Sequence, residues 1–262
     1  VAEDLNSAKN WVDAVMQDSL FGSAGKNILI EECLFGTELS FMGILTPKEF
    51  IPFETSVDYK PLLDGNNGPN TGGMGCISPS PFMNDELKNT VMQKVVKPTI
   101  DGLNKLGIHY YGFMYFGLMV KDNNPKVLEF NCRLGDPETQ CLMMQMESDL
   151  VDCLTDALKN NKVTINWKKG ASMGVVIASD GYPGRYTINK QISFGDTKNL
   201  KVFHAGTKST NGVLQTSGGR VFSVNYHGET LDLCSKYIYK NIEEVQFDGN
   251  IYRKDIGKIY ES

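Results

Sequence analysis

The sequence predicts an α+β protein with mixed and antiparallel sheets, in which a larger region is followed by a small C-terminal α+β unit. Three observations support this fold class. Apolar residues recur with helical spacing in residues 7–20. Apolar, β-branched and aromatic runs such as residues 37–45 have the length of strands. From about Lys169, short strand-like runs alternate with glycine-rich turns, which indicates a change of architecture.

The first part of the chain is predicted to form one helix and three strands. The helix covers residues 7–20, and Gly22 and Gly25 end it. The strands are predicted at residues 27–32, 37–45 and 50–53. Pro47 provides the turn between the last two strands.

The middle of the chain begins with a glycine- and asparagine-rich loop at residues 56–81. Loops of this length are usually functional or disordered. We expect a helix to follow, capped by Asn84 and interrupted at Pro98. Strands are then predicted at residues 110–120 and 126–131, and one long helix from Asp136 to Ala157.

The C-terminal unit is predicted to contain four short strands and a helix. The strands are expected at residues 171–178, 200–204, 212–216 and 220–225, and the helix at residues 230–240. Glycines punctuate these runs, as in Gly181, Gly206 and the pair Gly218 and Gly219.

Composition and charge exclude several classes of function. A chain of 262 residues can bury a substantial core in one large or two smaller domains. The formal net charge of −5 argues against a nucleic-acid partner. No apolar run approaches the ~18 residues of a membrane span. The six cysteines form no C-x-x-C pair and the three histidines lack metal-ligand spacing, so we expect reduced, buried thiols and no zinc site.

The strongest chemical signal is an alternation of polar residues in the second of the two middle strands. Alternate residues of a strand share a face, so Glu129 and Asn131 project together, and Arg133 joins them if the strand stays extended. Leu128 and Phe130 are then expected to face the core. A carboxylate and an amide oxygen suit Mg²⁺, and an arginine suits a phosphate undergoing transfer. The alternative is a structural Glu–Arg ion pair at a strand end.

Three weaker signals come earlier in the chain. The glycine-rich residues 69–75 expose successive N–H groups to an anion, or form a plain turn, because neither common nucleotide-binding motif is present. Glu31 and Glu38 suit an adenine and a ribose hydroxyl, or are solvated acids at a strand end. Asp58 and Lys60 suit a zwitterion, or form a surface pair of little energetic value.

Together these segments closely resemble the glycinamide ribonucleotide synthetases (phosphoribosylamine–glycine ligases), a family of ATP-grasp enzymes of purine biosynthesis. The matching segments run in order over essentially the whole chain. They are I-E-E-C-L-F-G-T-E-L-S-F from Ile30, G-P-N-T-G-G-M-G from Gly68, Y-G-F-M-Y-F-G-L-M from Tyr111, V-L-E-F-N-C-R-L-G-D-P-E-T-Q from Val127, G-Y-P-G from Gly181, V-F-H-A-G-T-K from Val202, G-G-R-V from Gly218 and R-K-D-I-G from Arg253. Chance agreement of eight ordered segments is not credible.

The resemblance implies a partial ATP-grasp fold with three parts. Residues 1–31 correspond to the remainder of the small lobe, residues 32–168 to the catalytic lobe with the metal site, and residues 169–262 to a small C-terminal α+β domain.

The resemblance also implies roles for single residues. Glu129 and Asn131 match the ligands of Mg²⁺ or Mn²⁺, and Arg133 matches the catalytic residue near the transferring phosphate. The residues that match adenine and ribose contacts of ATP are Glu31, Leu34 and Glu38. The residues that match loops around glycine and the product are Asp58, Lys60, Thr71, Gly72, Gly73, Asp136 and Glu138.

The reaction of the family joins glycine to 5-phosphoribosylamine and splits ATP to ADP and phosphate, through glycyl phosphate. Such a reaction needs neutralisation of phosphate charge more than a proton-transfer residue. The chain begins with Val1 and lacks the N-terminal domain and the Gly-Lys-Gly-Val segment of the family. We therefore expect a cytoplasmic ligase portion that is inactive without this N-terminal region. The alternatives are a noncatalytic docking module, or an ATP-grasp ligase for another acid and amine.

Overall fold

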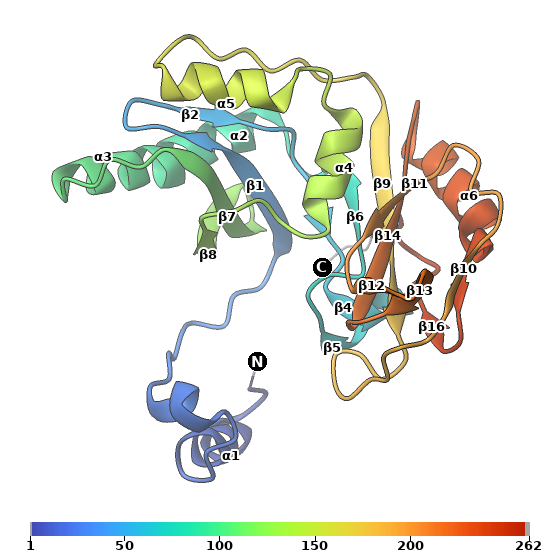
Figure 1. The fold of residues 1–262 in the computed structure, drawn as a ribbon. Coiled ribbons are helices and arrows are strands. Elements are labelled where there is room, and N and C mark those ends of the chain that lie inside the picture. Colours follow the sequence, from blue (N-terminus) through green and yellow to red (C-terminus); the bar gives the residue numbers. More distant parts are fainter. Residues whose placement is uncertain (1, 260–262) are drawn as a thin grey trace. The chain divides into compact units, whose positions relative to one another are not determined.

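Two units make up the chain, Val1–Phe35 and Gly36–Ser262, and the computed structural model describes residues 2–259 (Figure 1). In the first unit, helix α1 (Leu5–Met16) begins at Asp4, whose carboxylate accepts a hydrogen bond from the Ser7 backbone N–H at 2.7 Å. Ser7 Oγ accepts from the Asp4 N–H in return, which satisfies two amide groups at the helix start. Trp11 of this helix stacks on Phe21, with ring centroids 6.4 Å apart. The short 3₁₀ helix η1 (Gly22–Lys26) follows.

The strand predicted at residues 27–32 was wrong. These residues form no ladder with another strand in the described part of the chain, and Leu29 and Ile30 are 81% and 82% exposed. A short apolar run becomes a strand only when a neighbour takes up its backbone hydrogen bonds, and periodicity alone does not supply that neighbour.

The second unit contains a four-stranded antiparallel sheet in the order β2-β1-β7-β8. Its strands are β1 (Thr37–Leu45), β2 (Phe50–Pro52), β7 (Gly112–Lys121) and β8 (Asn124–Asn131). One face, with Phe41 and Phe116, packs on the helical run α2 (Asp85–Val91), η3 (Met92–Val96) and α3 (Lys97–Lys105). As predicted, Asn84 caps this run, and its hydrogen-bonding pattern changes in η3, just before Pro98.

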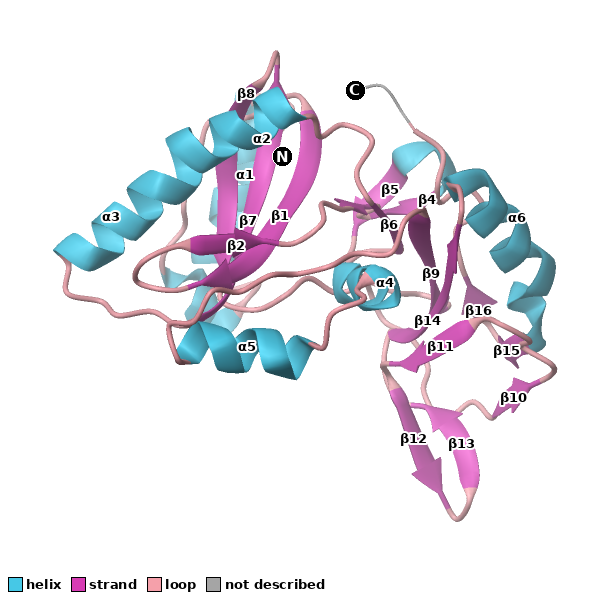
Figure 2. Ribbon diagram, turned by 90° about the horizontal axis from the view of Figure 1, so that it is seen from above, coloured by secondary structure: helices cyan, strands magenta, loops and turns pink. Residues whose placement is uncertain are grey.

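The opposite face of this sheet packs on α4 (Glu138–Gln145) and α5 (Leu150–Leu158) (Figure 2). These two helices correct the prediction of one long helix. Met146 is extended and pairs with Trp167, and the Asp149 side chain caps α5. The helical apolar spacing continues across the break because both helices contribute to the same cluster, through Leu142 and Cys153.

A six-stranded antiparallel sheet forms the second layer of this unit. Its path is β11-β14-β9-β6-β3, with β16 also paired to β9. The strands are β3 (Val57–Asp58), β6 (Gly75–Ser78), β9 (Ala171–Ser179), β11 (Lys201–His204), β14 (Arg220–Gly228) and β16 (Asn250–Ile251). Helix α6 (Leu231–Asn241) packs on it through Cys234 and Ile238. The sheet therefore joins strands from both sides of residue 169, and the three predicted domain boundaries stay predictions.

The predicted long loop at residues 56–81 contains more structure than expected. It holds β3, the hairpin β4 (Pro61–Leu63) and β5 (Asn67–Asn70), the short η2 (Asp64–Asn66) and the fully buried β6. Ladder bonds to β9 make β6 a strand even though its sequence has no apolar period. Two further sheets have two strands each: β10 (Ile192–Phe194) pairs with the distant β15 (Val245–Phe247), and β12 (Thr207–Thr210) forms a hairpin with β13 (Val213–Thr216). The turn η4 (Ile242–Glu244) precedes β15.

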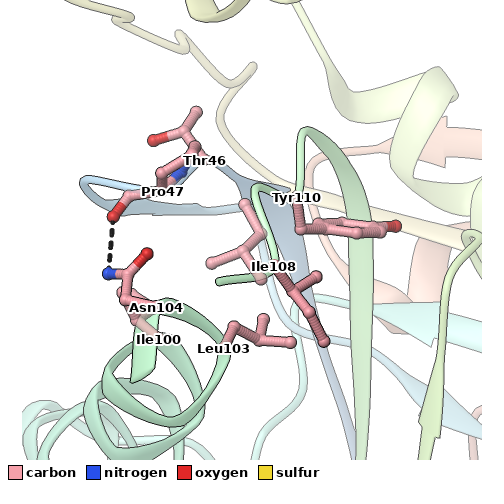
Figure 3. Close-up of a pocket in the computed structure, with 8 residues that line it drawn as sticks. Thr46, Pro47, Ile100, Leu103, Asn104, Ile108 and Tyr110 are labelled. Carbon is pink, nitrogen blue, oxygen red and sulfur yellow. Dashed lines mark hydrogen bonds between the residues drawn. The ribbon is translucent and has the colours of Figure 1, made fainter. Parts of the chain in front are cut away.

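A small hollow lies beside the turn between β1 and β2, against the end of α3 (Figure 3). Its empty volume is about 160 Å³, and Asn104 Nδ2 closes one side by donating to the Pro47 carbonyl at 3.0 Å. In residues 2–259, no helix combines the length and the apolar character that a membrane crossing requires.

Candidate active site

An acidic face of the four-stranded sheet carries the predicted metal ligands. Ser40 of β1 lies opposite Gly117 of β7, which lies opposite Glu129 of β8, and Tyr115 lies opposite Asn131. Glu129 and Asn131 therefore share a face, as predicted, and Asn131 Nδ2 donates to Glu129 Oε1 at 3.0 Å. A Cβ at Gly117 would lie 2.8 Å from Glu129 Cγ, so the glycine gives the glutamate side chain its space.

The expectation that Leu128 and Phe130 face the core was wrong for Leu128, whereas Phe130 does lie on the core side of the sheet, opposite Phe116. Gly117 pairs with Glu129 but Leu118 pairs with Val127, so Leu128 is the extra residue of a β-bulge and is 36% exposed. Phe130 contacts Phe116, with centroids 5.6 Å apart, yet it is 53% exposed because β8 is the edge strand.

Arg133 lies beyond the end of β8 rather than on its face. Its Nη1 donates to the Leu134 carbonyl at 3.1 Å, and the side chain is exposed. Among the described residues no ion pair joins it to Glu129, so the structural Glu–Arg pair considered from the sequence does not form.

A largely buried acid–base cluster continues on the same face of the sheet through Ser40 and Tyr115. Glu138, in the first turn of α4, is 2% exposed and accepts from Ser40 Oγ at 2.9 Å. The Ser40 and Tyr115 hydroxyls are 3.0 Å apart. Lys60 Nζ lies 2.9 Å from Asp58 Oδ2 and 3.5 Å from Glu38 Oε1. The Asp58 side chain is 4% exposed and the Lys60 side chain 26%, so they form a partly buried pair and not the surface pair that the sequence left open.

Lys60 pairs with two carboxylates, Asp58 and Glu38, and the buried Glu138 carboxylate lies close enough to raise the pKa of both. Burial raises the pKa of Asp58 well above its ordinary value, the Glu138 charge raises it further, and Lys60 opposes both. Burial also raises the pKa of Glu38, with Lys60 lowering it and the Glu129 charge raising it. Burial would lower the pKa of Lys60, but Asp58 and Glu38 raise it overall, so Lys60 stays protonated. The carboxylates of the cluster therefore outnumber its ammonium groups, and one more cation would balance their charge.

Asp58 also has an unmet hydrogen-bonding capacity. Its Oδ1 is buried and has no partner. A buried acceptor without a partner costs free energy and calls for an explanation such as a missing ligand. Gly73 lies directly against this oxygen: its φ is +115°, and a Cβ there would stand 2.5 Å from Asp58 Oδ1.

The glycine-rich loop does not present the free N–H groups that the sequence suggested. The amides of residues 71–74 all donate inside the protein, each at 2.9 Å. Their acceptors, in chain order, are Lys60 O, Tyr182 Oη, Thr71 Oγ1 and Tyr59 O. Reading these residues as an open anion cradle was therefore wrong, although the loop does lie against Asp58.

Sequence reasoning missed four polar residues of this region. Ser40 and Tyr115 bind within the cluster, and Arg220 and Tyr182 bind the loops around it. All four residues lie inside segments that carry the resemblance, and this was the only signal for them that the sequence offered. Their spacing and charge did not indicate a role.

The structure brings together the predicted substrate residues but not all the predicted ATP contacts. Asp58, Lys60, residues 71–73, Asp136 and Glu138 gather in one region of the second unit, together with Glu38. Glu31 and Leu34 belong to the Val1–Phe35 unit. Their shared contact with ATP stays a prediction.

The donors at Glu129 and Asn131 fit a hard cation. Among the described residues, no three His, Cys, Asp or Glu side chains gather around a possible metal position. Mg²⁺ does not need such a group, because it binds one or two protein oxygens and completes its shell with phosphate oxygens and water. A cation here would take the Asn131 amide oxygen, which requires the amide to turn over from its bond with Glu129.

The class of this protein follows from its sheets and from the match to family models. Residues 1–139 match the model of the phosphoribosylglycinamide synthetase ATP-grasp (A) domain, so the fold is ATP-grasp, as the sequence predicted. Residues 172–259 match the model of the phosphoribosylglycinamide synthetase C domain. The chain belongs to the phosphoribosylglycinamide synthetase family, and the resemblance stated from the sequence is confirmed.

Individual relatives agree with this family. The phosphoribosylamine–glycine ligase of Clostridium acetobutylicum is 44% identical over 260 residues, which are 98% of this chain and 62% of the relative. That of Salmonella typhimurium is 43% identical over 264 residues, again 98% of this chain and 62% of the relative. The chain thus spans less than two thirds of the length of these curated relatives.

Solved structures give the same result. The crystal structure of a phosphoribosylamine–glycine ligase from Thermotoga maritima has a TM-score of 0.85 at 33% identity, over 95% of this chain and 63% of that one. The biotin carboxylase domain of the Hydrogenobacter thermophilus 2-oxoglutarate carboxylase, in complex with MgADP and bicarbonate, has a TM-score of 0.66 at 14% identity, over 94% and 54%. The second likeness concerns the fold alone.

Proposed function

We propose that this chain is the part of a phosphoribosylamine–glycine ligase that holds the metal end of the ATP site and the glycine site. The reaction joins glycine to 5-phosphoribosylamine and converts ATP to ADP and phosphate. The observation that carries the proposal is the continuity of the acidic face with the buried cluster. Ser40 bonds Glu138 and stands in the same cross-strand row as Glu129. The γ-phosphate of ATP and the carboxylate of glycine would therefore bind side by side on one face of the four-stranded sheet.

The glycine site follows from the charges of the cluster. The glycine ammonium supplies an N–H donor to the unpartnered Asp58 Oδ1 and a positive charge to a cluster in which Glu138 has no cationic partner among the described residues. Lys60 bridges Asp58 and Glu38 and keeps both carboxylates in place. Thr71, Gly72, Gly73 and Asp136 enclose the site as backbone walls, since Gly73 lies against Asp58 and Pro137.

The phosphate end involves the β8 residues. Glu129 and Asn131 would hold Mg²⁺ or Mn²⁺, which supplies charge neutralisation on the phosphates when bound. Arg133 is exposed and unpaired with an acid among the described residues, so its guanidinium is available for the transferring phosphate. Glu31, Leu34 and Glu38 would contact the adenine and ribose of ATP.

The chemistry then needs orientation more than proton transfer. The glycine carboxylate attacks the γ-phosphorus of ATP, which releases ADP and forms glycyl phosphate. The amine of 5-phosphoribosylamine attacks the glycyl carbonyl carbon, and the phosphate leaves with the bonding electrons while the amine loses a proton. In such a site, positioning of the carboxylate in line with the phosphate and electrostatic stabilisation of the phosphate charge together contribute most of the rate acceleration.

The test is the Glu129→Gln substitution in the complete ligase that carries this chain. We expect Mg²⁺-dependent ATP turnover with glycine to fall on the order of 10²-fold or more, because one charged metal ligand is lost. Glu243→Gln, at an exposed position in η4, is the matched control and should keep normal turnover. Near-normal turnover of Glu129→Gln would sink the metal assignment.

Two further assays separate the alternatives. Turnover with another carboxylic acid but not with glycine would indicate a different ATP-grasp ligase. If the chain binds the N-terminal region of the ligase but the pair shows no turnover, a docking module is the better description. Turnover that appears only when the two are combined supports the proposal that the N-terminal region is a required partner.

A further inference from the structure

We propose that Arg220 and Tyr182 are positioning residues for the glycine site, a role that rests on the function proposed above. Both come from the C-terminal part of the chain, and both lie in segments, G-G-R-V and G-Y-P-G, to which that function gives no task. They bind the two loops that enclose Asp58 and Glu138.

Arg220 joins the two loops through a single guanidinium group. Its Nη1 donates to the Gly72 carbonyl at 2.7 Å and to the Asp136 carbonyl at 2.6 Å, with a longer contact to the Gly73 carbonyl at 3.4 Å. Its Nη2 donates to Asp136 Oδ2 at 3.1 Å. The side chain is 22% exposed. A planar fork can satisfy acceptors on two loops at once, which a point charge such as lysine cannot do equally well.

Tyr182 binds the same loop through the backbone N–H of Gly72, whereas Arg220 binds the Gly72 carbonyl. Its hydroxyl accepts from the Gly72 N–H at 2.9 Å, so both the N–H and the carbonyl of Gly72 are bound by the C-terminal part. Glycines make these approaches possible. A Cβ at Gly72 would lie 3.0 Å from the Arg220 guanidinium and 3.1 Å from the Tyr182 hydroxyl. A Cβ at Gly219 would overlap the Tyr182 ring.

The consequence for the site is geometric. Gly73 follows Gly72 and lies against Asp58 Oδ1 and Pro137, and Asp136 immediately precedes the turn that carries Glu138. Holding Gly72 and Asp136 together therefore fixes the loop backbone against which the Asp58 oxygen lies. Arg220 and Tyr182 bind Gly72 and Asp136 in the two loops and do not bind Asp58 or Glu138, so they act on the site through the loops. A displacement of about 1 Å at such a site can cost on the order of 10²-fold in rate.

The test uses four variants in the complete ligase. Tyr182→Phe removes only the hydroxyl and keeps the ring against Gly219. Tyr186→Phe is its matched control, because the neighbouring ring lies 6.4 Å away and no hydrogen bond of its hydroxyl occurs among the described residues. Arg220→Gln removes the fork, and Arg220→Lys tests whether charge alone restores the function.

Steady-state kinetics distinguish positioning from a merely structural role. We expect Tyr182→Phe to raise KM for glycine about 3- to 10-fold, the value of one hydrogen bond, while KM for ATP changes less than about twofold. Arg220→Gln should lower kcat/KM for glycine on the order of 10²-fold, with Arg220→Lys intermediate. Equal changes in KM for glycine and ATP would overturn the proposal.

Hydrogen–deuterium exchange tests the proposal without turnover. Amide exchange of residues 71–74 should quicken in Tyr182→Phe and Arg220→Gln and stay at the wild-type rate in Tyr186→Phe. Unchanged exchange in the first two variants overturns the positioning role. A wild-type ligase without glycine turnover contradicts the proposed function instead, and leaves the exchange result to decide whether these residues hold the loops.

Discussion

Two buried acid–base clusters in the Gly36–Ser262 unit differ in how completely their hydrogen bonds are satisfied. The Arg253 side chain is fully buried and donates to Asp255 at 2.7 and 2.8 Å, to the Pro61 carbonyl at 3.0 Å and to Asn66 Oδ1 at 3.0 Å. Its guanidinium also lies 5.3 Å from the centroid of the Tyr59 ring.

The cluster at Asp58 has the opposite character. Asp58 and Glu38 share Lys60, Glu138 has no ion pair among the described residues, and Asp58 Oδ1 has no partner. The first cluster anchors the β4–β5 hairpin to the C-terminal segment and is complete without a ligand. The second is incomplete in both charge and hydrogen bonding. In the first cluster every charged group is paired, so removing one partner would leave an uncompensated buried charge, whereas the unpartnered oxygen of the second cluster is a candidate ligand contact.

The largest expected effect comes from breaking the complete cluster. Arg253→Met leaves the buried Asp255 carboxylate without its guanidinium and should lower the free energy of unfolding by about 3–5 kcal/mol. Urea unfolding of the chain measures this value. Lys190→Met is the control, because its pair with Asp248 is exposed and should contribute less than about 1 kcal/mol. A similar loss of unfolding free energy in Arg253→Met and Lys190→Met would show that the buried pair contributes no more than the exposed pair.

A smaller effect is expected at the glycine that closes the incomplete cluster. Gly73→Ala must adopt a φ of +115° and place its Cβ 2.5 Å from Asp58 Oδ1, and we expect a loss of about 1–3 kcal/mol. Gly212→Ala separates the two causes, because Gly212 also has a positive φ of +80° but no atom within 4 Å of its added Cβ. Equal losses at both positions would show that contact with Asp58 contributes nothing.

The smallest effect is the pH dependence of Asp58. Its pKa is raised in the folded protein, so its stabilising contribution is fully present below the ordinary carboxyl pKa and is lost as the pH rises through the folded pKa. In that window the free energy of unfolding should fall by up to about 1.4 kcal/mol per pH unit in the wild type. Asp58→Asn cannot ionise and should lack this fall.

Unfolding titrations at several pH values provide the measurement for this comparison. Asp248→Asn is the control, because its pKa is lowered by the hydrogen bond from Lys190 and its loss leaves the Asp58 transition intact. If the free energy of unfolding depends on pH in the same way in the wild type and in Asp58→Asn, Asp58 is not the group that titrates.

Local patterns predicted the sheet at the site better than they predicted its surroundings. The strand at residues 37–45 matches β1 residue for residue, and the alternation that pairs Glu129 with Asn131 holds in β8. Both depend on period-two geometry within one strand. The pattern failed at Leu128, because a bulge is set by the register with β7, which the sequence of β8 alone does not contain.

Other features depended on contacts between distant segments. The apolar spacing from Leu142 to Ala157 is the same for one helix as for two that pack on one cluster, so the break at Met146 was invisible in the pattern. Arg220 reaches Gly72 and Asp136 across separations of 148 and 84 residues. No spacing rule connects positions so far apart.

The sequence by itself determined the family and the fold class, because ordered motifs and strand periodicity are local features of the chain, and it predicted which residues would bind a cation and a phosphate. Only the tertiary structure decided that Asp58 is buried with an unpartnered oxygen, that the loop amides at residues 71–74 are already bonded, and that Arg220 joins two loops. The physical reason is that burial, charge sharing and hydrogen-bond satisfaction are properties of neighbours in space, and most of these neighbours are far apart along the chain.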